Sequence, residues 1–173
     1  MSESLHSDYI FNSALETGMR TVCILVVNLS NKFDIQQLLA LDHIVVHSGD
    51  IENAPPSLHP NTLQRSGELL VRRPLIENGL VLMESKRLVE KVITADGFYY
   101  CATELASVFI ESLTNKYIEE LNQRAQWAVT MYRDYGDKLF SEIFNSAFGR
   151  WRNEFQLAEM SIAKDGGEKL NGN

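Results

Sequence analysis

This chain of 173 residues has little of what marks secreted, membrane-spanning or metal-binding proteins. Its two cysteines, Cys23 and Cys101, lie far apart, so neither a disulfide framework nor a cysteine metal site is expected. The longest apolar run, at 22–27, is flanked by Arg20 and Asn28 and falls short of the roughly 20 residues that span a bilayer. The start of the chain lacks the basic and apolar regions of a signal peptide. We therefore expect a cytoplasmic protein with reduced thiols.

Positive charge is also scarce. The chain has 16 lysines and arginines against 23 aspartates and glutamates, which gives a formal net charge of −7. Residues 53–102 form the least acidic segment, with 6 basic and 5 acidic side chains, but this is no basic patch. Proteins that bind DNA on their own generally carry a clustered basic surface. The composition therefore argues against an autonomous DNA-binding protein.

Motifs for nucleotide binding or covalent catalysis are missing. The chain has no glycine-rich phosphate loop, and Ser48 and Ser66 lack the context of a nucleophile elbow. His43 and His47 are four residues apart, so a helix would present both imidazoles to a metal, with Asp50 close behind. The glutamate of an HExxH motif is absent, and no third ligand stands out. We expect histidines that cap or pair locally, and no metal, cofactor or catalytic residue. A small hydrolase using these three residues is the weaker alternative.

The most distinctive local pattern lies in residues 61–103. Proline is tolerated at the first position of a helix, so one helix is expected over 62–72 and a second from Pro74 onward. Two β-rich runs, 88–93 and 98–102, flank an Asp-Gly pair, which is typical of a β-hairpin. Helix, break, helix and hairpin together predict a winged helix-turn-helix.

Further helices are expected on both sides of this pattern. One, over 14–28, should begin with a Ser-x-x-Glu capping box at Ser13, and another, over 35–47, with Asp34 as its N-cap. The predicted fold is mainly α, in the α+β class, with a winged helix-turn-helix core and a β-hairpin wing. We expect three parts: a winged-helix-like domain at 11–103, a C-terminal helical extension at 104–163 and a disordered tail at 164–173.

Candidate contacts with a partner or DNA fall into three groups. The basic group could meet carboxylates or phosphates; it comprises Arg65, Arg72, Arg73, Lys86, Arg87 and Lys91. The second group lies in a proline-containing loop and comprises Asp50, Ser57 and His59. The third is on the last predicted helix and comprises Trp151 and Phe155. The alternatives are solvated charge at a helix end for Arg72 and Arg73, and core packing for Trp151 and Phe155.

The end of the helix at 62–72 should separate core from surface. A buried Leu69 would cost roughly 2–5 kcal/mol when replaced by alanine. Arg72 and Arg73 are expected at the exposed end of this helix, beside the break at Pro74. Glutamate at both positions should therefore leave the fold largely intact, since surface changes typically cost within about 0.5 kcal/mol.

Four strings in the sequence resemble one known family. They are FNSALETGMR at 11–20, LDHIVVHSGD at 41–50, PPSLHPNT at 55–62 and RSGELLVRR at 65–73. They are similar to the middle component two proteins of bacterial ABC-three-component systems, a family similar to the small C subunit of Lamassu anti-phage systems. The resemblance covers about residues 11–132. It implies a small non-catalytic subunit made with an SMC-like ABC ATPase and an effector, usually a nuclease.

The expected function combines this resemblance with a fold-level analogy to winged-helix subunits that dock on SMC heads. An accessory subunit would bridge the ATPase and the nuclease effector, and restrain the effector until foreign DNA is sensed. DNA would be touched indirectly or weakly, through the complex. The alternative is a stand-alone winged-helix transcriptional regulator, which needs a basic recognition helix. Residues 74–86 hold only Lys86 against Glu77 and Glu84.

Overall fold

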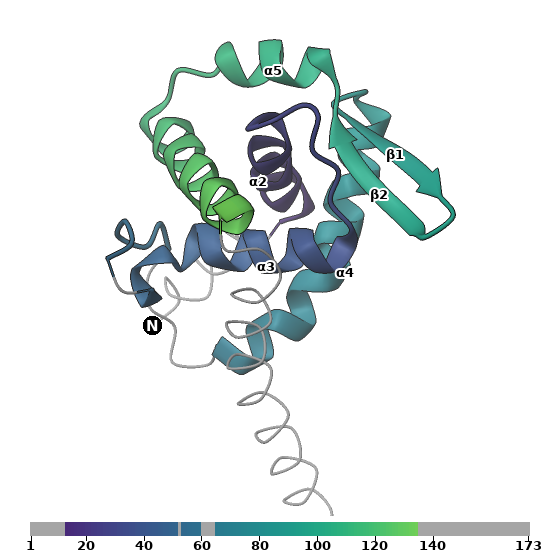
Figure 1. Cartoon of the computed structure of the whole chain (residues 1–173). Helices are drawn as coiled ribbons and strands as arrows, with labels where there is room; N and C mark the ends of the chain where they lie inside the picture. Colours follow the sequence, from purple (N-terminus) through teal and green to yellow (C-terminus); the bar gives the residue numbers. More distant parts are fainter. Residues whose placement is uncertain (1–12, 52, 60–64, 135–173) are drawn as a thin grey trace, which may run out of the picture.

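The computed structural model describes residues 13–51, 53–59 and 65–134 (Figure 1). Its elements are α2 (Ala14–Val26), α3 (Ile35–Val46), the short 3-10 helix η1 (Ser48–Asp50), α4 (Arg65–Ser85), β1 (Val89–Thr94), β2 (Gly97–Ala102) and α5 (Glu104–Glu111). Residues 116–134 are helical as well. The described chain is thus mainly helical with one two-stranded sheet, which confirms the α+β class. The predicted tail and the helix carrying Trp151 and Phe155 lie outside the described residues.

Helices α2 and α3 begin at the predicted capping residues. The hydroxyl of Ser13 accepts a hydrogen bond from the amide of Glu16 at 3.2 Å. Asp34 Oδ1 accepts from the amide of Gln37 at 2.8 Å, and Gln37 Oε1 accepts from the amide of Asp34 at 2.9 Å. These contacts satisfy amides that have no partner inside the first helical turn. Both predicted helix starts are confirmed.

Helix α4 is continuous where the sequence predicts two helices. Pro74 lies inside it, although an interior proline removes one backbone hydrogen bond and costs about 3 kcal/mol. The helix continues because Arg72, Ile76 and Leu80 are all buried and share one helix face at a spacing of four residues. A break at Pro74 would turn Arg72 away from this face. The expected helix-turn-helix within 62–86 is therefore wrong.

Helices α2 and α4 cross at two glycines and make the most extensive contact between labelled elements. A Cβ atom added at Gly79 would lie 2.7 Å from the amide nitrogen of Gly18 and 2.9 Å from its Cα. A Cβ at Gly18 would lie 2.7 Å from the methyl group of Met83 and 3.0 Å from the carbonyl oxygen of Gly79. The two helices therefore approach to backbone contact, which leaves no room for a side chain between them.

The predicted hairpin is confirmed. β1 and β2 are antiparallel, with Thr94 opposite Gly97 and a two-residue turn between them. Phe33, just before α3, bridges to β2: its amide donates to the carbonyl of Tyr100 at 3.1 Å and its carbonyl accepts from the amide of Tyr100 at 2.8 Å. Figure 1 shows the hairpin extending away from the helices toward its turn, and Ile93 and Phe98, next to the turn, are exposed.

One hydrophobic core joins the helices to the C-terminal part of the described chain. Helices α2, α3 and α4 contribute Leu25, Leu38, Leu41, Ile76 and Leu80, and the later segments contribute Ala106, Ile110, Ile118, Leu121 and Ala125. The ring of Tyr132 also packs edge-on against Phe33, with centroids 5.7 Å apart. The described part of the predicted extension thus shares the core of the first part.

No helix in the described ranges is long and apolar enough to cross a membrane.

Candidate functional site

Four charged side chains from three helices meet in the interior, and we call them the buried charge cluster. They are Glu16 and Arg20 of α2, Asp42 of α3 and Arg72 of α4. Arg20 and Arg72 are 1% exposed and Asp42 is 0% exposed. Charged groups are almost never this deeply buried unless they are paired.

Asp42 lies between two guanidinium groups. Arg20 Nε donates to Asp42 Oδ1 at 2.6 Å, and Arg20 Nη2 donates to Oδ2 at 3.4 Å. Arg72 Nη1 donates to the same Oδ2 atom from the opposite helix. Arg20 Nη1 also lies 3.4 Å from Glu16 Oε1. Two carboxylates therefore balance two guanidinium groups, and the ion pairs tie α2, α3 and α4 together.

Asp42 and Arg20 keep their charges at neutral pH. Burial alone would raise the pKa of Asp42, but Arg20 and Arg72 outweigh it and lower that pKa to about 2. Burial likewise opposes the charge on Arg20, yet Asp42 outweighs it and raises the pKa of Arg20. Burial raises the pKa of Glu16, although Arg20 acts in the opposite direction. The central pair is an ionised salt bridge.

His59 and Tyr117 border the cluster and connect it to the helix over 116–134. The hydroxyl of Tyr117 donates to Glu16 Oε1 at 3.2 Å. His59 Nε2 lies 3.3 Å from the Tyr117 hydroxyl and 3.7 Å from Glu16 Oε1. Burial is the main cause that lowers the pKa of His59 to about 4, and the positive charge of Arg20 adds to it. The ring is therefore neutral at pH 7. Burial also raises the pKa of Tyr117 to about 12.

The histidine pair at the end of α3, His43 and His47, has a cation beside it. The rings of His43 and His47 have centroids 5.0 Å apart, and Arg72 Nη2 lies 3.3 Å from His47 Nε2. Among the residues that the structure describes, no group of three or more His, Cys, Asp or Glu side chains could hold a metal ion. The side chain of Asp50 lies outside the described residues.

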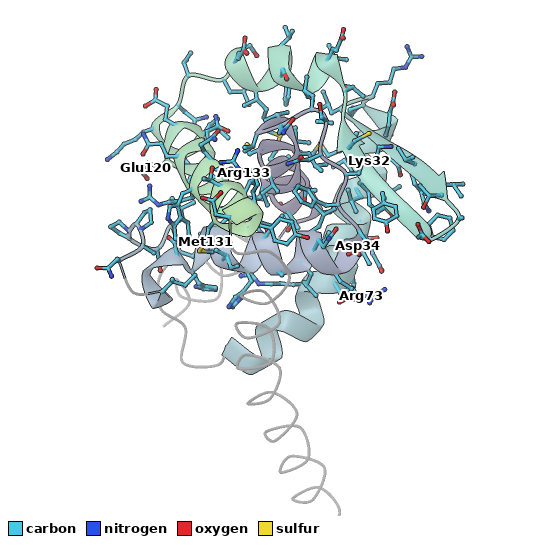
Figure 2. The ribbon with its side chains drawn as sticks, viewed as in Figure 1. Lys32, Asp34, Arg73, Glu120, Met131 and Arg133 are labelled. Atoms are coloured by element: carbon cyan, nitrogen blue, oxygen red, sulfur yellow. The ribbon has the colours of Figure 1, made fainter. Side chains whose placement is uncertain are left out.

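Two adjacent arginines have opposite environments. Arg72, expected at an exposed helix end, is buried against Asp42, so that expectation is wrong. The cause is the continuity of α4, which keeps Arg72 on the core-facing side. Arg73 points outward (Figure 2), and its Nε atom lies 3.0 Å from Glu77 Oε1 in an exposed pair. Of these two arginines, Arg73 is therefore the one at the surface, where a partner or DNA could contact it.

The other basic candidates lie near the hairpin. Lys86 and Arg87 are exposed at the end of α4, before β1 begins. Lys91 is exposed on β1, and its ammonium group lies 4.3 Å from the centre of the Phe98 ring. The side chain of Arg65 is outside the described residues. Lys91 is thus the basic candidate that the structure combines with an exposed aromatic ring.

The proline-containing loop folds back on the body of the protein. Ser57 is exposed, and its hydroxyl accepts a hydrogen bond from the amide of Gly49 at 3.1 Å. Arg124 Nε donates to the carbonyl of Pro56 at 3.0 Å. His59, by contrast, turns inward and is 8% exposed. Of the loop candidates, Ser57 is placed at the surface and His59 is placed beside the buried cluster.

Sequence reasoning missed Arg20 and Asp42 as partners. Both residues stand in strongly apolar helices, and this was the available signal, because a charge on an apolar helix needs a buried counter-charge. The charged groups of the cluster bond to one another. The ion pairs of the cluster neutralise its charges and hold α2, α3 and α4 together.

Comparison with known proteins gives the family. The profile of the ABC-three-component system Middle Component 2 family matches residues 10–154. No curated protein and no solved structure matches the chain. The matched range contains the whole buried charge cluster and the hairpin, and it covers most of the 173 residues. The chain therefore belongs to the Middle Component 2 family of ABC-three-component systems.

Proposed function

We propose that this component of an ABC-three-component system is a non-catalytic subunit of a Lamassu-like anti-phage complex. It bridges an SMC-like ABC ATPase and a nuclease effector, and restrains the effector until foreign DNA is sensed. The observation that carries the proposal is the family match over residues 10–154. A middle component works with the other components of its system, and the cytoplasmic location and indirect DNA contact are part of the same proposal.

A binding role, as opposed to a catalytic one, also agrees with the buried charges being paired with one another. Arg20, Asp42 and Arg72 bond to one another below the surface. A substrate would have to break these ion pairs to reach them, and leaving a buried charge unpaired costs several kcal/mol, about 3–5. The cluster therefore supports a rigid scaffold better than a reaction centre.

We further propose that α2, α3, α4 and the hairpin form a winged-helix unit. Its paired helices are α3 and α4, in place of two halves of α4. The order of elements supports this, as does Phe33, which pairs with Tyr100 of β2 as a third, single-residue strand. In this unit α4 holds the position of a recognition helix and the hairpin holds that of the wing.

The charges on α4 favour the subunit over the stand-alone regulator. After the buried Arg72, the charged residues of this helix are Arg73, Glu77 and Glu84. Arg73 is paired with Glu77, so little positive charge remains for DNA phosphates. A recognition helix of this composition suits a protein surface better than a DNA groove.

Co-expression with the other two components of the same system tests the proposal. Size-exclusion chromatography with light scattering should show a stable complex that contains this chain. Omitting the chain should raise the nuclease activity of the effector in the absence of foreign DNA. A well-behaved monomer that ignores both components would contradict the proposal. Sequence-selective DNA binding by the chain alone, tighter than the nonspecific range of about 10⁻⁴–10⁻⁶ M, would favour the regulator.

A further inference from the structure

The inner face of the hairpin carries apolar side chains beyond the body of the protein. Val89 and Ala102, opposite each other at the base, are buried. Ile93 and Phe98, opposite each other near the turn, are 74% and 56% exposed. Alternate residues of a strand point to the same face, so both pairs lie on one face of the sheet. The face that packs on the core at its base is therefore uncovered, and still apolar, near its tip.

The main-chain groups of Lys91 and Ile93 point away from β2. Both polar main-chain groups of Tyr100 bond to Phe33, on the side of β2 opposite to β1. Lys91 lies directly across from Tyr100, so this is a non-hydrogen-bonded pair, and the amide and carbonyl of Lys91 face outward. The same holds two residues later at Ile93. Within the described ranges, no hydrogen bond joins these outward groups to another element.

The outer edge of β1 has a defined side-chain chemistry. Lys91 and Ile93 share the inner face, so a strand added beside β1 would place alternate side chains next to an ammonium group and next to an apolar surface. A carboxylate complements the first position. An apolar side chain complements the second, where it would cover Ile93 and the ring of Phe98. DNA phosphates do not suit this edge, because its second position, at Ile93 and Phe98, is apolar.

We propose that β1 is a docking strand for an extended segment of another component of the system. The segment adds to β1 through the outward main-chain groups of Lys91 and Ile93. It carries an acidic residue and an apolar residue two positions apart, and the apolar one covers Ile93 and Phe98. This inference deepens the proposed function and rests on it. An exposed strand edge is a known template for such strand addition.

Two substitutions at one position separate main-chain docking from side-chain effects. Lys91→Pro removes the outward amide and leaves the ladder to β2, because proline is tolerated where an edge amide faces solvent. Lys91→Ala removes the ammonium group and keeps the amide. In the full chain co-expressed with the other components, Lys91→Pro should weaken assembly at least about tenfold. Lys91→Ala should weaken it no more than about fivefold, the scale of one cross-strand pair.

A second pair of variants tests the apolar position. Ile93→Ser should weaken assembly about tenfold, because it removes the apolar contact of the added segment. Val81→Ser is the matched control, since Val81 is also exposed, at 65%, but lies on α4. Circular dichroism and thermal melting should show that all four variants remain folded. Assembly of the Lys91→Pro variant at wild-type affinity would overturn the proposal, and unchanged assembly of the Ile93→Ser variant would overturn its apolar contact.

The outcomes also separate this inference from the proposed function. If the wild-type chain fails to assemble with any component, the subunit proposal fails and the docking strand fails with it. If the wild-type complex forms and the Lys91→Pro complex is equally stable, only the docking strand fails. Light scattering on the chain alone covers one other occupant. A dimer that Lys91→Pro dissociates would mean that a second copy of this chain occupies the edge, and it would also overturn the proposal.

Discussion

The buried charge cluster and the hairpin use the same kinds of side chain in opposite ways. In the cluster, the guanidinium of Arg72 is buried and bonded to Asp42 of another helix. On the hairpin, the ammonium of Lys91 is exposed and lies over the ring of Phe98. The first charge is compensated inside the fold, whereas the second is open to a partner. The comparison shows that the role of a charge depends on where its counter-charge lies, and this is set by the fold.

Replacing the central carboxylate should have the largest effect on stability. Asp42→Asn keeps the size of the side chain but leaves Arg20 and Arg72 buried without their counter-charge. The free energy of unfolding should fall by about 3–5 kcal/mol. Asp96→Asn in the hairpin turn is the control and should change it by less than about 0.5 kcal/mol. Urea unfolding followed by circular dichroism measures both, and a loss at Asp42 as small as that at Asp96 would contradict the importance of the pairing.

The adjacent arginines give the next largest difference. Arg72→Ala removes one of the two cations on Asp42, and the other remains, so a loss of about 3 kcal/mol is expected. Arg73→Ala removes an exposed pair with Glu77 and should cost no more than about 1 kcal/mol. This replaces the sequence-based expectation that both positions tolerate glutamate. Equal thermal melting temperatures for the two alanine variants would show that the burial of Arg72 does not matter for stability.

As the pH falls, His59 should be the first group beside the buried charge cluster to lower the free energy of unfolding. Its pKa is lowered from 6.5 to about 4 in the folded protein, so the unfolded chain binds more protons between these values. Stability therefore falls as the pH drops through this window, by about 2 kcal/mol between pH 7 and pH 5. The groups that face His59 are Glu16, Arg20, Asp42, His47, Arg72 and Tyr117. The raised pKa of Glu16 acts in the opposite direction, because a pKa that is higher in the folded protein favours folding as the pH falls.

The control for this pH dependence is His59→Gln, which removes the titrating ring. Its urea-unfolding free energy should change less between pH 7 and pH 5 than that of the wild type. Asp42 adds a further loss at lower pH, because its folded pKa of about 2 is below its unfolded value of 3.8. That part of the stability is present above about pH 4 and is lost as the pH falls toward 2. The same slope in both proteins between pH 7 and pH 5 would rule out His59 as the source.

The hairpin should show the smallest effect on stability. Ile93→Ser and Phe98→Ser alter exposed side chains, so each should change the free energy of unfolding by less than about 1 kcal/mol. For Phe98 this includes about 0.5 kcal/mol for the contact with Lys91. Thermal melting of both variants and of the wild type measures these changes. A loss comparable to that of Asp42→Asn would mean that the tip of the hairpin belongs to the core.

Local chemistry made part of the fold predictable from the sequence. The caps at Ser13 and Asp34 and the turn before Gly97 depend on residues within a few positions of one another, so their signals are complete in the sequence. The continuity of α4 through Pro74 depends on burial of residues on both sides of the proline. That burial is set by contacts with other helices, and it outweighs the local preference for a break.

The buried charge cluster shows the same limit for the candidate site. Arg20 and Asp42 are 22 residues apart, and Arg72 is 30 residues beyond Asp42. Their pairing depends on how three helices pack, which no spacing rule contains. An arginine on a strongly apolar helix predicts a buried acidic partner but does not identify which acidic residue it is. The free edge of β1 was likewise beyond reach, because it follows from the pairing of Phe33 with β2.

The glycine contact between α2 and α4 makes the position of the hairpin sensitive to a single methyl group. Since no residue is smaller than glycine, any substitution at Gly79 can only push α4 away from α2. The hairpin follows α4 directly in the chain, so a small tilt at the crossing becomes a larger displacement at the turn near Gly97. The tilt is centred on the crossing with α2, and α4 carries the movement to the hairpin. Alanine at Gly79 is therefore a way to move the outer strand edge without changing any residue on it.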